Sequence, residues 1–155
     1  MRAKLGTGGA LLKVCVALAL LACGQIIASA AEIKLQTQLV WGTDDSKPPE
    51  GKDYKPVEPA ILKKLHDLPL KWKNYFEVKR IDFSVVPTVP KKVPLSEKCE
   101  LNVLSQNSST FEMALFGKGK EVVRRTQAMP KGEILVLGGN APNASAWLVI
   151  VKRVE

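Results

Sequence analysis

Residues 32–43 read EIKLQTQLVWGT and alternate between apolar and polar side chains. The apolar phase contains Ile33, Leu35, Leu39 and Trp41, and the polar phase contains Lys34, Gln36 and Gln38. A period of two residues is typical of a strand that buries one of its faces. We therefore expect a half-buried β-strand here, and the same alternation further along the chain decides the fold class.

Shorter alternating runs follow, separated by turn residues. Cys99, Leu101 and Val103 alternate, as do Phe111, Met113 and Leu115, and a further strand is expected over residues 121–129. The turns between these strands are predicted at the sequences GKGK (117–120) and PKG (130–132). Within residues 75–85 the apolar phase changes once, which indicates either a β-bulge or two separate short strands. Pro87, Pro90 and Pro94 are expected to interrupt the chain after this run.

The last two runs, ILVL at 134–137 and WLVIV at 147–151, are apolar in both phases. Strands of this kind are typical of positions covered on both faces, so we expect both to be central in their sheet. With turn residues recurring at short intervals, the pattern predicts a mainly β fold. We expect an antiparallel β-sandwich or a small barrel of about seven strands.

One short α-helix is predicted over residues 59–68. Pro59 suits the first helical position, and Ile61, Leu62, Leu65 and Leu68 share one face. Pro69 should end the helix, which is too short to be stable unless it docks on the sheet. The preceding residues 44–59 contain four prolines and little that can pack, which indicates an extended surface connection.

The first thirty residues have the three parts of an export signal. Basic residues come first, the apolar run VCVALALLA follows at 14–22, and Ala28-Ser29-Ala30 supplies small residues for cleavage. We expect a signal peptide at 1–30 and a single β-rich domain at 31–155. One alternative is lipidation of Cys23, which follows the lipobox-like sequence LLA; the other is an uncleaved membrane anchor.

Removal of the signal changes the composition of the working protein. The 155 residues carry a net charge of +8, and three basic but no acidic residues precede residue 31, so residues 31–155 carry +5. This length supplies one domain and excludes larger two-domain enzyme folds. Cys99 is then the one remaining cysteine, which excludes an internal disulfide in that domain. Its alternation with Leu101 and Val103 predicts a buried, unreactive thiol.

A basic and aromatic cluster lies just after the predicted helix. The candidate binding residues are Lys71, Trp72, Lys73, Tyr75, Lys79 and Arg80. Such a surface suits an anionic partner, and export favours anionic lipid or cell-envelope polysaccharide over nucleic acid. The alternative is that Trp72 and Phe76 pack in the core while the lysines are solvated. If this cluster does not bind lipid, contact with a membrane would require a lipidated Cys23 or an uncleaved signal.

The sequence offers no motif for catalysis, metal or cofactor binding. His66 is the single histidine, and no ligand set of suitable spacing surrounds it. The acidic residues 44, 45, 50 and 53 follow no EF-hand spacing, and no nucleophile elbow or phosphate-binding loop occurs. We expect an exported, non-catalytic binding or accessory protein of the cell envelope or extracellular space that needs no cofactor. The alternatives are a small secreted hydrolase with carboxylates distant in sequence, or a lipid-anchored structural component.

Overall fold

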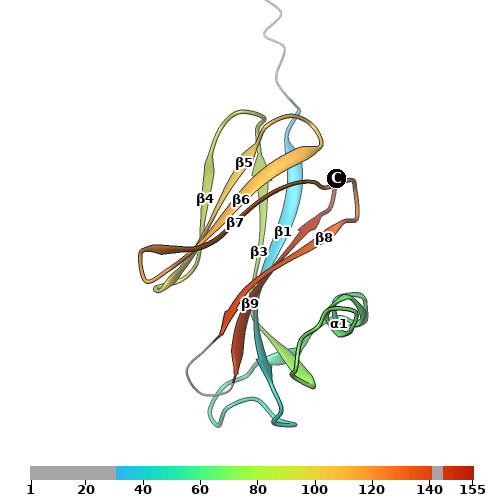
Figure 1. Cartoon of the computed structure of the whole chain (residues 1–155), viewed down its shortest axis with the longest axis vertical. Coiled ribbons are helices and arrows are strands. Elements are labelled where there is room, and N and C mark those ends of the chain that lie inside the picture. The colour runs from blue at the N-terminus through green and yellow to red at the C-terminus, as the bar shows by residue number, and fades with distance from the viewer. Residues whose placement is uncertain (1–30, 141–144) are drawn as a thin grey trace, which may run out of the picture.

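The computed structural model describes residues 31–140 and 145–155, and strands account for 57% of them. Two antiparallel sheets face each other without closing into a barrel, and one short helix lies beside them (Figure 1). The mainly β class is thereby confirmed. The predicted signal at 1–30, including Cys23, lies outside the described residues.

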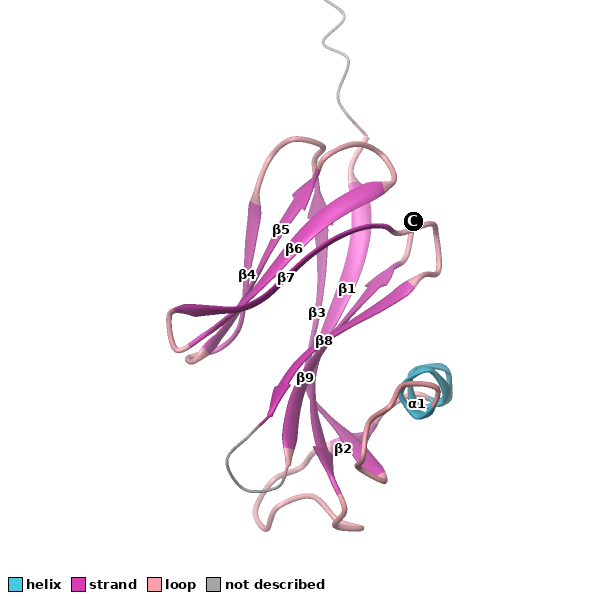
Figure 2. Ribbon diagram, in the orientation of Figure 1, coloured by secondary structure: helices cyan, strands magenta, loops and turns pink. Residues whose placement is uncertain are grey.

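The two sheets contain nine strands. The five-stranded sheet has the order β2 (Lys55–Pro56), β3 (Asn74–Val85), β1 (Ile33–Thr43), β9 (Ala146–Arg153), β8 (Ile134–Asn140). The four-stranded sheet has the order β4 (Lys91–Ser96), β5 (Cys99–Ser105), β6 (Thr110–Gly117), β7 (Lys120–Ala128). The helix α1 (Pro59–His66) follows β2 in the chain and is the cyan element in Figure 2.

The expected number of about seven strands is wrong, because two short strands occur where prolines suggested irregular chain. β4 contains Pro94, which was expected to break the chain. β4 lies at a sheet edge, where the missing proline N–H removes no bond to a neighbouring strand. β2 is only two residues long and pairs with β3 through Lys55 and Pro56, inside the proline-rich connection.

β1 is buried on both of its faces over most of its length. Every residue from Thr37 to Thr43 is buried, so the expectation of a half-buried strand holds only for residues 33–36. One face of the five-stranded sheet packs against the four-stranded sheet in a core that contains Leu35, Leu101 and Phe111. The other face packs against α1 through Val40, which lies in a second core with Ile61 and Leu65.

The phase change predicted in residues 75–85 is a β-bulge within one continuous strand. In the pairing of β1 with β3, Leu39 lies opposite Lys79 and Val40 lies opposite Glu77, so Val78 is the extra residue. The bulge places Glu77 and Arg80 on one face, although they are three residues apart in a strand. Their side chains pair there, with Arg80 Nη2 2.6 Å from Glu77 Oε2.

The two apolar strands near the C-terminus have different positions in the sheet. β9 lies between β1 and β8 and is central, as predicted, whereas β8 lies at the edge. β8 is nevertheless covered on both faces. Leu135 and Leu137 belong to the core between the two sheets, which we call the sandwich core, and Ile134 and Val136 pack against the second core. The prediction that both strands are central is therefore wrong for β8, because coverage by α1 makes an edge strand apolar in both phases.

The helix ends two residues earlier than predicted. The backbone N–H of Asp67 still bonds to the carbonyl of Lys63, but Leu68 bonds only to Leu65, in a tighter turn. Leu68 therefore leaves the helix and joins a short connection that continues to Lys73. Pro69 is compatible with this turn because its ring disfavours a helical conformation in the residue before it.

Replacing Thr37 by valine should stabilise the fold. The Thr37 hydroxyl is fully buried and has no hydrogen-bond partner among the described residues, so the isosteric methyl removes an unsatisfied polar group. We expect Thr37→Val to raise the free energy of unfolding by about 1 kcal/mol in urea titrations. Thr43→Val is the matched control, because Thr43 Oγ1 accepts a hydrogen bond from the Asp45 N–H, and this variant should be destabilised. An equal effect of both substitutions would contradict the prediction.

Candidate functional site

Two cavities lie on the outer face of the five-stranded sheet near the β8 edge. In each, one wall comes from α1 or the residues that follow it, and the other comes from β8 and residues beside it. One cavity is lined by charged side chains and the other by apolar side chains. We define the α1–β8 groove as these two cavities and the edge of β8 between them.

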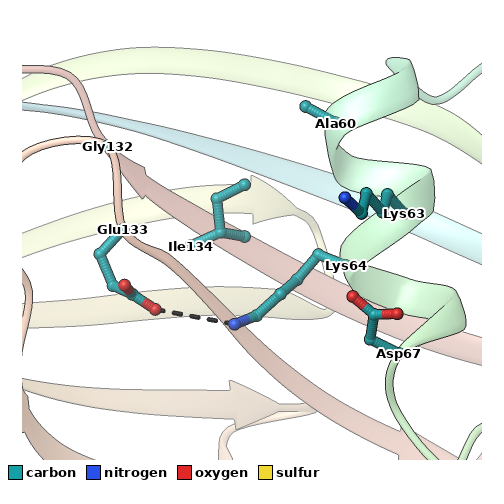
Figure 3. A pocket seen from close by; sticks show the side chains of 7 residues that line it. All are labelled: Ala60, Lys63, Lys64, Asp67, Gly132, Glu133 and Ile134. Carbon is teal, nitrogen blue, oxygen red and sulfur yellow. Dashed lines mark ion pairs between the residues drawn. The ribbon is translucent and has the colours of Figure 1, made fainter.

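The charged cavity lies between the exposed side of α1 and the start of β8 (Figure 3). Its volume is about 230 Å³, and its lining residues are Ala60, Lys63, Lys64, Asp67, Gly132, Glu133 and Ile134. Lys64 extends across the gap, and its Nζ lies 3.7 Å from Glu133 Oε1. Both side chains are more than one third exposed, so this ion pair contributes little to stability and can open for a ligand.

The apolar cavity lies beneath the connection that follows α1. Its volume is about 340 Å³, and its lining residues are Leu68, Pro69, Leu70, Trp72, Val136, Gly138, Ala146 and Leu148. Gly138 of β8 and Ala146 of β9 contribute no large side chain to this lining, and Leu148 occupies the space directly beside Gly138. A Cβ added at Gly138 would lie 2.5 Å from Leu148 Cδ2, so even alanine there would displace Leu148.

The backbone of β8 presents unpaired polar groups along this groove. The Arg153 N–H donates to the Glu133 carbonyl, which places residues 133, 135, 137 and 139 in the pairs that bond to β9. Ile134, Val136 and Gly138 therefore direct their N–H and C=O groups away from β9. No backbone partner on that side is found for them among the described residues.

The other sheet edges carry side chains that oppose pairing with a further strand. β4 contains Lys91, Lys92 and Pro94, and β7 contains four charged residues among its nine. β2 is two residues long and includes Pro56. β8, with the sequence ILVLGGN, has no charged residue and no proline. Charges, proline and shortness protect edges from unwanted pairing, and β8 has none of these features.

The two aromatic residues of the predicted binding cluster are buried in the second core. Trp72 is 8% exposed and Tyr75 is 3% exposed, so neither ring forms an open surface platform beside the lysines, although Trp72 lines the apolar cavity. Lys71 lies with its Nζ 5.4 Å from the centre of the Trp72 ring. The structure thus favours the alternative in which the aromatics pack while the lysines remain at the surface.

The basic residues of that cluster make different contacts. Arg80 is held by Glu77 and by Glu58, with Arg80 Nη1 2.5 Å from Glu58 Oε1. These carboxylates raise the pKa of the Arg80 guanidinium well above its ordinary value. Lys79 reaches the Pro94 carbonyl on β4 at 3.4 Å, whereas Lys71 and Lys73 are exposed beside Trp72. Only Lys71 and Lys73 are thus available together for a ligand.

The remaining predicted residues have ordinary surroundings. Cys99 is half-buried against the sandwich core, and burial raises the pKa of its thiol. His66 is exposed, with its ring centre 6.1 Å from that of Tyr75. Within residues 31–140 and 145–155, no three His, Cys, Asp or Glu side chains gather as a metal site, and no helix could span a bilayer. The sequence also contains two formal N-glycosylation sequons, which begin at Asn107 and Asn143. Asn107 lies in the β5–β6 turn, and Asn143 lies outside the described residues.

Sequence reasoning missed the residues that form the groove, with the exception of Trp72, which was a predicted binding residue and lines the apolar cavity. Their signal is the absence of charge and proline in ILVLGGN, which distinguishes β8 from the other edges. We find no match to the chain among protein-family models, curated proteins or solved structures. The α1–β8 groove and the exposed Lys71 and Lys73 are therefore the candidate functional surfaces of the protein.

Tyr75 should make the fold sensitive to alkaline pH. Burial and, secondarily, the Asp44 carboxylate raise the pKa of its phenol above the ordinary value of 10.0. The folded state thus holds this proton more tightly than the unfolded state, so stability is lost as the pH rises above about 10. We expect Tyr75→Phe to reduce the fall in the free energy of unfolding between pH 9 and 11. Tyr54→Phe is the control, and an unchanged pH dependence in Tyr75→Phe would disprove the role of this phenol.

Proposed function

We propose that this protein is a non-catalytic binding protein that holds its ligand in the α1–β8 groove. The observation that carries the proposal is the apolar cavity beside an uncharged, unprotected strand edge. Ligand sites are commonly concave and mostly apolar, with a few polar groups that fix orientation. Here Trp72, Leu148 and their neighbours supply the apolar lining, and the Lys64–Glu133 pair supplies polar groups at the other end.

The proposal also includes the compartment in which the protein acts, and the features of residues 1–30 support it. A basic start, an apolar run and the Ala28-Ser29-Ala30 site are typical of export. We propose a binding or accessory role in the periplasm or extracellular space, either free after cleavage or attached through a lipid on Cys23. The hydrolase alternative would rely on Asp67 and Glu133, the two carboxylates that line the charged cavity.

Filling the apolar cavity should abolish binding of small apolar probes. We expect indole and isoamyl alcohol, added to residues 31–155, to shift the backbone amide NMR signals of Leu70, Val136 and Leu148. Ala146→Met places a flexible apolar chain in the cavity and should remove these shifts. Ala114→Met is the control, because Ala114 is equally buried but lies in β6 of the other sheet. Absence of groove shifts in the parent protein would refute the proposal, and thermal unfolding would verify that both variants are folded.

A second candidate function is attachment to an anionic surface through Lys71 and Lys73. Both are exposed, and neither ammonium group pairs with a carboxylate among the described residues. Two adjacent unpaired cations suit lipid phosphate or acidic polysaccharide.

The double variant Lys71→Ala/Lys73→Ala should lose salt-sensitive retention on vesicles that contain phosphatidylglycerol. Electrostatic attachment weakens as the ionic strength rises, so retention of the parent protein should also fall between 0.05 and 0.5 M salt. Lys118→Ala/Lys120→Ala removes the same charge from the β6–β7 turn and the start of β7, and serves as the control. If both double variants bind equally, the Lys71–Lys73 surface has no specific role.

A further inference from the structure

We infer that the ligand of the α1–β8 groove is an extended polypeptide segment that adds to β8 as an antiparallel strand. This inference rests on the proposed function and identifies the chemical class of the ligand. It is carried by two independent features of the same place, namely the unpaired backbone of β8 and the position of the two cavities beside it.

The backbone of β8 identifies the ligand as a polypeptide. Ile134, Val136 and Gly138 present alternating N–H and C=O groups at the spacing of a strand, so a second strand satisfies all of them at once. Peptide recognition by strand addition uses main-chain bonds for affinity and side-chain pockets for specificity. The part of the sheet that the structure describes is antiparallel throughout, and antiparallel pairing is slightly the more stable, which favours that direction for the added strand.

The cavities determine which side chains the added strand should carry. Directly opposite residues of antiparallel strands share a face, so the residues opposite Gly138 and Val136 point toward the apolar cavity. Two positions further along the added strand, the residue opposite Ile134 points toward the charged cavity and its Lys64–Glu133 pair. From its N-terminus, the segment therefore has two alternate apolar residues followed, at the next alternate position, by a polar residue.

The side chains that the two cavities require argue that the added strand comes from a different polypeptide and not from a second copy of this one. Antiparallel pairing of β8 with its own copy requires a two-fold axis perpendicular to the sheet. Paired about Val136, the copy would place its Gly138 opposite Ile134, so it would bring no polar side chain to the charged cavity. A foreign segment can carry a polar residue at that position.

A synthetic peptide with selectively methylated backbone nitrogens tests the inference. The probe is an end-blocked nonapeptide with the sequence Lys-Thr-Leu-Thr-Val-Thr-Gln-Thr-Lys. Its leucine, valine and glutamine are meant to lie opposite the three outward-facing residues of β8. We expect it to bind residues 31–155 and to slow hydrogen exchange of the Val136 and Gly138 amides about tenfold or more. N-methylation of the leucine and valine removes bonds to β8 and should weaken binding at least about tenfold, whereas N-methylation of the threonines should not.

The remaining outcomes separate this inference from the proposed function. If indole occupies the cavity but the peptide gives no protection of Val136 and Gly138, the inference is wrong and the binding function stands. If neither ligand binds, both are wrong. Equal loss with both methylation patterns, or loss only with methylated threonines, contradicts antiparallel addition. Protection that appears without peptide and rises with protein concentration identifies a second copy as the occupant and also overturns the inference.

Discussion

From Thr37 to Thr43 every residue of β1 is buried. Leu39 packs in the core between the two sheets, Val40 packs in the second core with α1, and Trp41 lies beside Phe76 of β3. A strand covered on two faces favours apolar side chains in both phases, as in β9; in β1, Thr37, Gln38 and Thr43 are buried polar exceptions. Burial on two faces also explains why an eight-residue helix is stable in this protein. Ile61 and Leu65 reach the sheet surface around Val40, and this contact supplies the stability that so short a helix lacks alone.

The same two-sided burial requires the bulge in β3. Tyr75 must face α1, whereas Ile81 and Phe83 must face the sandwich core, and a regular strand would place all three on one side. The extra residue Val78 changes the phase between them. β7 has a comparable irregularity, since Leu115 lies opposite Val123 and Phe116 opposite Glu121, which makes Val122 the extra residue. In both strands the bulge brings a glutamate and an arginine three positions later onto one face, where they pair.

The groove follows from the way in which the helix covers the sheet. The five-stranded sheet extends beyond the four-stranded sheet toward the end where β2 and α1 lie (Figure 1). The helix covers the outer face at that end, and the connection after it passes over Gly138 and Ala146, where small residues leave space. The coverage makes β8 apolar in both phases, but its outer backbone edge is left unpaired. An edge strand without protecting charges or proline is a hazard for aggregation, and its retention here accords with a role in binding.

The sequence by itself determined the mainly β class, the start of the helix at Pro59, the phase change between residues 75 and 85 and most strand positions; that this phase change is a bulge in one strand was decided by the structure. These features depend on local periodicity and on proline, which are visible along the chain. Only the tertiary structure decided that Pro94 lies within a strand, that β8 is an edge strand, and that Trp72 and Tyr75 are buried. Each of these depends on which segment packs against which, since an edge tolerates proline, a docked helix covers an edge strand, and the aromatic rings fill the space beneath that helix. Periodicity reports how many faces of a strand are buried, but it carries no information on whether its two backbone edges are paired.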